Sequence, residues 1–474
     1  MKLAKTLILS GLILSSVANS TEPTAAGQSI DQHLSGGATT VLDNSNNAFS
    51  LPANNLSILR RDNFFIGNAF FKQPWVIAPS STSARDGLGP LFNSNSCQGC
   101  HVKDGKGRPP LTREEKFIST LVRVSIPAAT PATPAQQALL TTLGIVPEPT
   151  YGDQIQPNSI PGLKAEATPR FDYEEIRGQF KDGETYTLLK PSLKLDNLNY
   201  GALHPQVQMS ARVAPVMIGM GLLAAIPEAD LLALADPEDK NADGISGRVN
   251  QVWDVSSQKT VLGRFGWKAN QPTVAQQSAG AFHGDLGISS PLFTGQPCTA
   301  AQTDCLAAPQ GGQPEINQEL MDMVTFYASL LAVPARRDVN DPEVLKGERL
   351  FKQANCSACH LPELKTGVKP DFPELEHQRI QPFTDLLLHD LGEGLADQRP
   401  DFLASGREWR TAPLWGIGLV ATVNGHTRFL HDGRARNLME AILWHGGEAE
   451  ASRQQVLNLS QAERAALLRF LNSL

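Results

Sequence analysis

The chain has 474 residues, a formal net charge of −7 and no long block of basic residues. This length allows two or three domains, and the acidic balance argues against nucleic acid as a partner. Its 39 Gly and 33 Pro, with only 6% aromatic residues, favour a protein rich in loops.

The first twenty residues have the pattern of a secretory signal peptide. Lys2 and Lys5 form a basic start, residues 7–17 form an apolar run, and Ala-Asn-Ser follows at residues 18–20. The apolar run is too short to cross a bilayer, and no later stretch without charges approaches that length. We therefore expect cleavage before Thr21, a periplasmic location and no stable membrane span in the mature chain. An uncleaved anchor helix is the alternative.

Two five-residue strings share the pattern C-x-x-C-H. In this pattern two thiols add across the vinyl groups of a c-type haem, and the histidine binds the iron on its proximal face. Two covalent haems are therefore the leading interpretation, with structural zinc or a redox dithiol as the alternative. Covalent haem attachment takes place outside the bacterial cytoplasm, which agrees with export. The residues are Cys97, Cys100 and His101 for the first haem and Cys356, Cys359 and His360 for the second.

Amphipathic segments predict helices at matching places in two halves of the chain. Residues 342–353 carry apolar side chains at helical spacing and lead into the second haem string. Residues 319–330 and 463–474 have similar sequences and would close the two halves. Between haem string and closing helix, each half also carries an Arg-x-Ala-Pro string, at residues 212–215 and 410–413. Their common order indicates a duplicated unit.

These patterns predict a mainly α fold with two cytochrome c-like haem modules. We place the signal peptide at residues 1–20, an enlarged N-terminal haem domain at residues 21–335 and a C-terminal cytochrome c domain at residues 336–474. The first domain would carry a loop-rich insertion with some β structure at about residues 110–205, because its haem string and Arg-x-Ala-Pro string lie much further apart.

One segment of the first half begins like a calcium-binding loop. Asp239, Asn241 and Asp243 occupy the first three ligand positions. Position twelve is Asn250 rather than glutamate, so one bidentate carboxylate is missing. Calcium binding and a turn capped by its own carboxylates both remain open.

The two other cysteines, Cys298 and Cys305, lie in a polar loop. In an oxidising compartment a local disulfide is the leading interpretation, and a reactive dithiol is the alternative.

Several further strings resemble one group of haem enzymes. They are similar to strings of the bacterial di-haem cytochrome c peroxidases, of the methylamine-utilisation di-haem enzyme and, closer still, of the di-haem oxidoreductase family, described as peroxidases or thiol oxidoreductases. The resemblance covers nearly all of the mature chain and is most specific in its C-terminal third. The strings are residues 87–93, 243–248, 264–269, 410–414, 429–434 and 443–448.

The resemblance also points to a sixth ligand for the second haem. In the peroxidases an axial Met follows the His of a His-Asp-Gly string by fourteen residues, and a Tyr takes this place in the methylamine-utilisation enzyme. Counted from His431, this place is His445. We expect His445 to bind the iron, with a surface histidine as the alternative. His431 is expected to be structural or to contact a haem propionate, and Arg434 and Arg436 are candidate propionate partners.

For the first haem, the resemblance implies a distal glutamate that moves a proton between the peroxide oxygens. Glu228 follows the first Arg-x-Ala-Pro string and is our candidate, and Arg212 could stabilise developing charge. His204 and His283 are alternative distal ligands. Four tryptophans are candidate electron relays between the haems, although core packing is the leading interpretation for each. They are Trp267, Trp409, Trp415 and Trp444.

The expected function is that of a di-haem oxidoreductase that reduces hydrogen peroxide. The haem bound through His360 would accept electrons from a small cytochrome or cupredoxin, and the haem bound through His101 would meet the oxidant. Two alternatives remain: a di-haem electron carrier, and an enzyme that oxidises a partner protein through high-valent iron.

Overall fold

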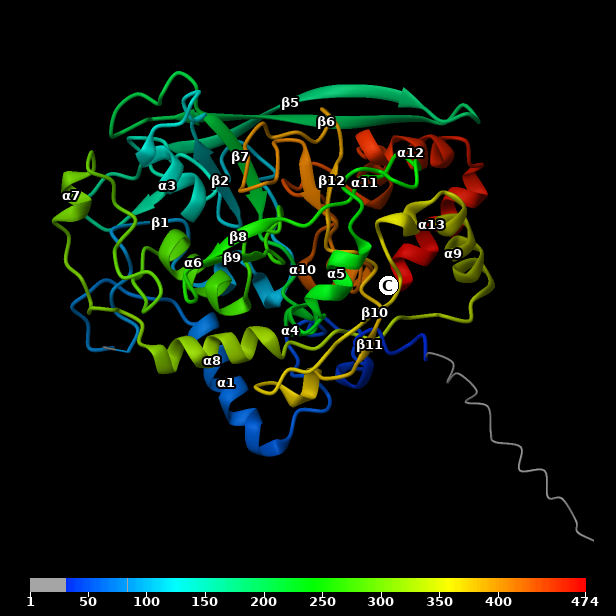
Figure 1. Ribbon diagram of the computed structural model, residues 1–474, viewed down its shortest axis with the longest axis horizontal. Helices are drawn as coiled ribbons and strands as arrows, with labels where there is room; N and C mark the ends of the chain where they lie inside the picture. Colours follow the sequence, from blue (N-terminus) through cyan, green and yellow to red (C-terminus); the bar gives the residue numbers. More distant parts are fainter. Residues whose placement is uncertain (1–30, 83) are drawn as a thin grey trace, which may run out of the picture. The chain divides into compact units, whose positions relative to one another are not determined.

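The computed structural model describes residues 31–82 and 84–474, so the expected signal peptide at residues 1–20 lies outside the described residues. Residues 32–474 form one unit. Its helices are short, and most lie between irregular segments rich in Gly and Pro (Figure 1). They are α1 (Ile58–Lys72), α2 (Cys97–Cys100), α3 (Pro134–Thr142), α4 (Met220–Ala224), α5 (Glu228–Leu234), α6 (Val274–Leu286), α7 (Thr303–Leu306), α8 (Gln318–Ser329), α9 (Pro342–Gln353), α10 (Val420–Asn424), α11 (Leu438–Leu443), α12 (Glu450–Leu457) and α13 (Gln461–Ser473).

Within the described residues, the strands form small, separate antiparallel sheets. The largest has three strands in the order β3-β2-β7, and five further pairs are β1-β4, β5-β6, β8-β9, β10-β11 and β12-β13. The strands are β1 (Leu91–Phe92), β2 (Thr120–Ser125), β3 (Gln154–Ile155), β4 (Asn158–Ser159), β5 (Thr168–Gln179), β6 (Thr185–Asp196), β7 (Gln208–Val213), β8 (Gln251–Asp254), β9 (Lys259–Leu262), β10 (Leu364–Lys365), β11 (Arg379–Ile380), β12 (Leu388–Asp390) and β13 (Glu408–Arg410).

The prediction of a mainly α fold with cytochrome c-like modules is wrong. Helices account for only 30% of the structure and strands for 17%, in several antiparallel sheets. The amphipathic segments do form helices, but the prediction also assigned mainly helical structure to the chain between them. That chain is broken by Gly and Pro. It contains the local β5-β6 hairpin and also pairs such as β2-β7, which join segments distant in sequence. Hydrophobic periodicity cannot reveal the distant pairs.

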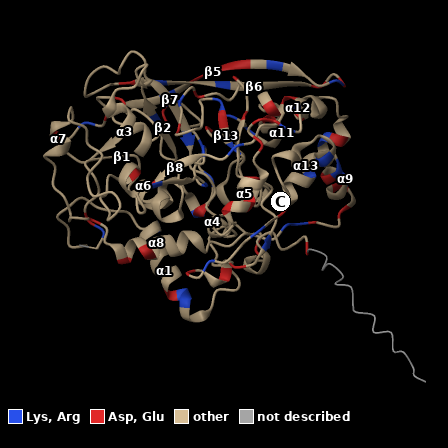
Figure 2. Cartoon of the chain, in the orientation of Figure 1, with Lys and Arg blue, Asp and Glu red and all other residues tan. Residues whose placement is uncertain are grey.

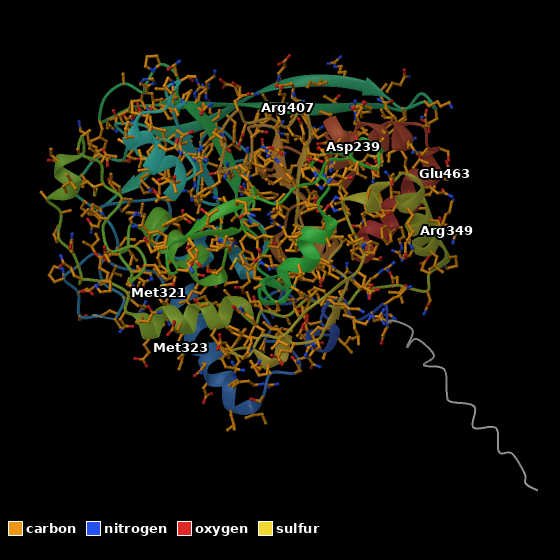
Figure 3. The ribbon with its side chains drawn as sticks, viewed as in Figure 1. Asp239, Met321, Met323, Arg349, Arg407 and Glu463 are labelled. Atoms are coloured by element: carbon orange, nitrogen blue, oxygen red, sulfur yellow. A yellow bond between two sulfur atoms is a disulfide. The ribbon has the colours of Figure 1, made fainter. Side chains whose placement is uncertain are left out.

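One arrangement of helices does occur in both halves. The helix that precedes each haem string packs against the helix that closes that half: α1 against α8, and α9 against α13 (Figure 1). Both pairs cross at a glycine. A Cβ atom on Gly67 would lie 2.0 Å from the carbonyl oxygen of Met323, which Figure 3 labels on α8. A Cβ on Gly347 would lie 2.0 Å from the carbonyl oxygen of Ala466. Only glycine permits so close an approach.

Each helix pair also carries a phenylalanine to a haem-string histidine. Phe71 and Phe351 each lie four residues, about one helical turn, after the crossing glycine. The ring centroids of Phe71 and His101 are 6.2 Å apart, and so are those of Phe351 and His360. The packing behind each histidine is therefore duplicated.

The expected insertion contains the longest strands of the protein. β5 and β6 form a hairpin whose middle is exposed and carries charges of both signs (Figure 2). Its far end is anchored, because Phe180 and Leu188 are buried in the main hydrophobic core. Arg464 of α13 forms an ion pair with Asp182 at 2.9 Å. The hairpin thus ties the first half of the chain to its last helix.

Two further expectations can be compared with the structure. Cys298 and Cys305 form a disulfide, as predicted, with an S–S distance of 2.01 Å. Among residues 31–82 and 84–474, none of the helices combines the length and the apolarity that a membrane crossing requires.

Candidate functional site

The first haem string forms a single helical turn, α2, that its preceding serine caps. The Ser96 hydroxyl accepts a hydrogen bond from the Gly99 N–H at 3.1 Å. His101 donates from Nδ1 to the Pro215 carbonyl at 2.8 Å. Burial lowers the pKa of His101 to about 4, so the ring is neutral. This tautomer leaves Nε2 as the metal-binding nitrogen.

The second haem string gives its histidine the same arrangement with a different partner. His360 donates from Nδ1 to the Phe383 carbonyl at 3.0 Å, and burial lowers the pKa of His360 to about 4. Cys356, Cys359 and His360 border a cavity of about 280 Å³. This volume is near the lower end of the roughly 300–1,000 Å³ that ligand sites occupy. The lining is mostly apolar and includes Ile218, Leu223, Phe265, Trp415, Leu438 and Leu467.

His445, the expected sixth ligand, lines the same cavity as His360. It follows α11 and donates from Nδ1 to the Ala441 carbonyl at 2.7 Å, which again leaves Nε2 to bind a metal. The two imidazoles are close enough that a charge on His445 would lower the pKa of His360. The structure thus brings the two histidines to one cavity, each with the tautomer that iron binding requires.

The haem-string thiols lie in surroundings that do not suit a redox dithiol. Burial raises the pKa of Cys97 and of Cys356 to about 12. Reactive cysteines have lowered pKa values, because the thiolate is the nucleophile. The arrangement therefore favours thiols used for covalent attachment over thiols used for exchange.

The helices α6 and α11 can be aligned by their N-cap residues, and this alignment gives the residue of the first half that corresponds to His445. Each helix begins after an N-cap residue, Thr273 or Asn437, whose side chain accepts an N–H of the first turn. Thr273 follows Trp267 by six residues, just as Asn437 follows the histidine of the His-Asp-Gly string. His445 lies eight residues after its N-cap, and the residue eight after Thr273 is Ala281. By this count of residues, Ala281 corresponds to His445, so we infer a methyl group at the distal position of the first half.

His431 is buried at the wall of the cavity and stacks on Trp409. Their ring centroids are 3.7 Å apart and their planes differ by 13°. Burial lowers the pKa of His431 to about 3, so the imidazole is uncharged. Trp267 and Trp415 line the same cavity, whereas Trp444 packs in the surrounding core. The relay role of these tryptophans stays a prediction.

The two arginines expected to hold propionates have carboxylate partners within the protein. Arg434 pairs with Asp432 at 2.7 Å, and its guanidinium lies 4.8 Å from the Trp444 ring centroid. Arg436 pairs with Glu440 at 2.7 Å. Neither arginine belongs to the set that lines the cavity.

A buried cluster around His389, beside the second haem string, was not predicted from the sequence. His389 contacts Asp385 through Nε2 and Glu448 through Nδ1, each at 2.8 Å. Burial lowers the pKa of His389, but these hydrogen bonds outweigh burial and raise it to about 12. Its Nδ1 lies 3.7 Å from the Cys359 sulfur. No local motif identifies this cluster, because Glu448 joins from a distant segment.

The two residues expected at the first haem's reaction centre, Arg212 and Glu228, do not line the cavity at the second haem string. Arg212 is buried and forms ion pairs with Asp401 at 2.6 Å and Asp397 at 3.5 Å. Glu228 is exposed at the first turn of α5. Neither residue lines the cavity. Their catalytic roles stay predictions.

The two alternative histidine ligands occupy different surroundings. His204 is half-buried, and its Nδ1 accepts the Gln206 N–H at 3.2 Å. His283 lies on α6, two residues after Ala281, and stacks on Phe293 with a centroid distance of 5.5 Å. Burial lowers the pKa of His283. His283 therefore projects from the same helix as Ala281.

The expected calcium loop is a turn at the surface, where Figure 3 labels Asp239. Asp239 accepts the Asp243 N–H at 3.0 Å, and Asp243 accepts the Ile245 N–H at 2.9 Å. Asn250, at position twelve, is fully buried and donates to the carbonyls of Lys268 and Asp401. The carboxylates thus bond the turn's own amides, and calcium binding stays a prediction.

These surroundings fit haem groups. Both haem-string histidines and His445 present Nε2, and the second site combines an apolar cavity with two thiols. Lys106 and Arg410 also line this cavity. Haem requires such apolar walls, axial nitrogens and cationic groups for its propionates.

No curated protein and no solved structure matches the chain. One family model, described as "di-haem oxidoreductase, putative peroxidase", matches residues 29–474. This match spans both haem strings, His445 and the whole β5-β6 hairpin, so it covers every part of the site described above. The chain therefore belongs to the di-haem oxidoreductase family.

Proposed function

We propose that this protein is a periplasmic di-haem c-type oxidoreductase that reduces hydrogen peroxide. Each peroxide would take up two electrons and two protons and yield two waters. The thiols of both haem strings would form thioether bonds, and His101 and His360 would bind the irons on their proximal faces. The haem iron, once bound, supplies the redox chemistry.

The observation that carries this proposal is the difference between the two distal positions. His445 stands in the second half, and Ala281 stands at the corresponding place in the first. A methyl group cannot coordinate iron, and an open sixth position permits peroxide to bind, whereas a filled one favours electron transfer. The second haem would therefore store electrons and the first would meet the oxidant.

The chain's own residues orient the ligands and exclude water. The carbonyls of Pro215 and Phe383 fix the tautomers of His101 and His360. Such hydrogen bonds raise the basicity of the ligand and hold the ring in place. The apolar lining around the second string keeps water away and so strengthens each electrostatic interaction with the haem.

The remaining parts of the proposal concern partners and organisation. We propose a small cytochrome or cupredoxin as the electron donor, and cleavage of a signal peptide at residues 1–20. The haem-bearing domains would be residues 21–335 and 336–474. Calcium at Asp239, Asn241 and Asp243 is a further part, which rests on the ligand spacing alone.

Mass spectrometry and spin-resonance spectroscopy of the mature holoprotein test this proposal. We expect the mass of the chain from about Thr21 plus two haems, with one low-spin iron and one high-spin iron after half-reduction. The half-reduced protein should consume peroxide in the presence of a reduced donor. If both irons are low-spin in every oxidation state and peroxide leaves the spectrum unchanged, the protein is a di-haem electron carrier instead.

A further inference from the structure

Among the residues that line the cavity at the second haem string, basic side chains outnumber the carboxylates that pair with them. Three lysine or arginine side chains line it, and only Arg453 has a carboxylate partner, Glu450, at 2.7 Å. Among the described residues, neither Lys106 nor Arg410 has a carboxylate within ion-pair distance. The one acidic lining residue, Glu448, is bonded to His389 and Ser246. Two basic side chains thus line an apolar cavity without a paired carboxylate, and only the more distant charges of Asp432 and Asp385 favour their charged forms.

Lys106 reaches this cavity from the other half of the chain. It lies five residues after His101 and is only 7% exposed. Its Nζ donates to the Leu430 carbonyl at 3.2 Å and lies 4.7 Å from the Trp267 ring centroid. Burial lowers the pKa of Lys106 to about 7, and the charge of Asp432 opposes this only in part.

The backbone of Lys106 is held in place by the second half. Its N–H donates to Asn424 Oδ1 at 3.0 Å, and its carbonyl accepts from His426 Nε2 at 2.9 Å. The amide of Asn424 also donates to the Val102 carbonyl at 2.7 Å. The loop after the first haem string is therefore docked on the second half, and the position of the lysine is built into the fold.

Arg410 lies at the end of β13, and among residues 31–82 and 84–474 its guanidinium donates to carbonyl oxygens alone. Its Nε donates to Gly266 at 2.9 Å and its Nη1 donates to Thr411 at 3.3 Å. Burial lowers the pKa of Arg410 to about 10. The counterpart in the first Arg-x-Ala-Pro string, Arg212, has two aspartates instead. The difference leaves the guanidinium of Arg410 available to an anion in the cavity.

A buried cation without an anion is costly, because desolvation is not repaid. The group that fills the cavity should therefore carry two negative charges, and haem carries two propionate carboxylates. We propose that Lys106 and Arg410 bind the propionates of the second haem. This inference rests on the proposed function, since it requires a haem at Cys356, Cys359 and His360.

This assignment couples the two haem sites. Lys106 belongs to the loop of the first haem string but places its charge against the second haem. A nearby cation stabilises the reduced, more electron-rich form of a haem, so Lys106 raises the potential of the second haem. Any movement of the loop after the first haem string would then change the potential of the second haem.

Spectroelectrochemistry of the holoprotein tests the assignment, with the two haems distinguished by spin state. Lys106→Met should shift the midpoint potential of the second haem to a lower value and leave the first unchanged. Lys106→Arg should restore most of the wild-type value. Lys103→Met removes a charge from the same loop, away from the cavity lining, and should not shift the second haem. If Lys106→Met does not mature, Lys106→Gln supports the same comparison.

Arg410→Met tests independently whether Arg410 binds a propionate of the second haem. It should lower the same midpoint potential and change the propionate bending band in the resonance Raman spectrum. If both haems are present and neither Lys106→Met nor Arg410→Met moves the second potential, the assignment is wrong. An equal shift in Lys103→Met would also overturn it. If the wild-type mass shows fewer than two haems, the proposed function fails first.

Discussion

The two haem-string regions are alike behind the proximal histidine and different in front of it. In both, a helix crosses the closing helix at a glycine, Gly67 or Gly347, and carries a phenylalanine ring to 6.2 Å from the histidine ring. In front of it, His445 lines the cavity that His360 borders, whereas the residue that corresponds by residue count in the first region is Ala281. A duplicated proximal scaffold with divergent distal positions can give two irons different tasks.

The two regions also differ in how the arginine of each Arg-x-Ala-Pro string is paired. Arg212 and Arg410 occupy matching strings, yet Arg212 is neutralised by Asp397 and Asp401, whereas Arg410 faces the cavity without a carboxylate. Matching sequence strings therefore do not imply matching roles. The residue that pairs with each arginine comes from elsewhere in the chain and decides whether the charge is structural or available to a ligand.

The largest effect is expected from a histidine at the position that corresponds to His445 in the first half. Ala281→His should place an imidazole over the first iron, convert it to low-spin and abolish nearly all peroxide consumption. Spin-resonance spectra and peroxide assays of the same sample measure both effects. Ala281→Leu adds bulk without a ligand nitrogen and should leave the first iron high-spin. If Ala281→His keeps a high-spin iron, the two distal positions do not correspond.

The reciprocal substitution removes the imidazole from the second half. His445→Ala should convert the low-spin haem to high-spin and raise its potential, because a strong nitrogen ligand is lost. His204→Ala, which removes a half-buried histidine far along the sequence, is the matched control and should change neither property. A low-spin signal that survives in His445→Ala would redirect the assignment to His431 or Met439.

The two matching arginines should respond differently to removal. Arg212→Met removes one of the buried cations that pair with Asp397 and Asp401, which keep Lys268 and Arg399. It should lower the free energy of unfolding by about 1.5–3 kcal/mol, the range for hydrogen bonds to charged groups. Arg177→Met removes an exposed arginine paired with Glu175 and should cost no more than about 1 kcal/mol. Thermal or denaturant unfolding of the holoprotein measures both. A loss of peroxide activity without loss of stability in Arg212→Met would favour a catalytic role instead.

Local patterns revealed the features that depend on residues close in sequence. The haem strings, the Cys298–Cys305 disulfide and the helix at residues 342–353 are of this kind. His445 was predicted through the resemblance, as the residue fourteen positions after His431, and it lines the same cavity as His360. Its binding to iron stays a prediction. Such features need no knowledge of the tertiary fold.

Features that depend on distant partners could not be predicted in this way. The strands β2 and β7 pair across the whole insertion, and this pairing is one reason why the mainly α prediction is wrong. The position of Lys106 in the second cavity depends on Asn424, which lies more than three hundred residues away. Hydrophobic periodicity carries no information on such contacts.

A smaller difference between the two regions lies three residues after each proximal histidine. Asp104 is buried and accepts hydrogen bonds from Ser50 at 2.6 Å and Tyr327 at 2.7 Å, whereas Glu363 pairs with Arg379 near the surface. Burial raises the pKa of Asp104 from 3.8 to about 6, against the effect of these hydrogen bonds.

Because the folded state holds this proton more tightly than the unfolded state, the contribution of Asp104 to stability is fully present below pH 3.8 and is lost as the pH rises through about 6. The loss amounts to at most roughly 3 kcal/mol. Asp104→Asn should remove this slope, and asparagine tolerates the positive φ of 60° at this position. Glu363→Gln should leave it in place. Unfolding free energies between pH 4 and pH 7 measure the slope, and an unchanged slope in Asp104→Asn would contradict the prediction.

The smallest expected effect concerns the turn at Asp239, Asn241 and Asp243, which has no counterpart in the second half. Asp243→Ala removes a carboxylate that accepts the Ile245 N–H and should cost about 1 kcal/mol even without metal. If calcium binds, added calcium should raise the melting temperature of the wild type but not that of Asp243→Ala, because calcium requires these carboxylate oxygens. Asp230→Ala, on exposed α5, is the control and should keep the response to calcium. A wild-type melting curve that neither calcium nor a chelator moves would show that the carboxylates serve the turn alone.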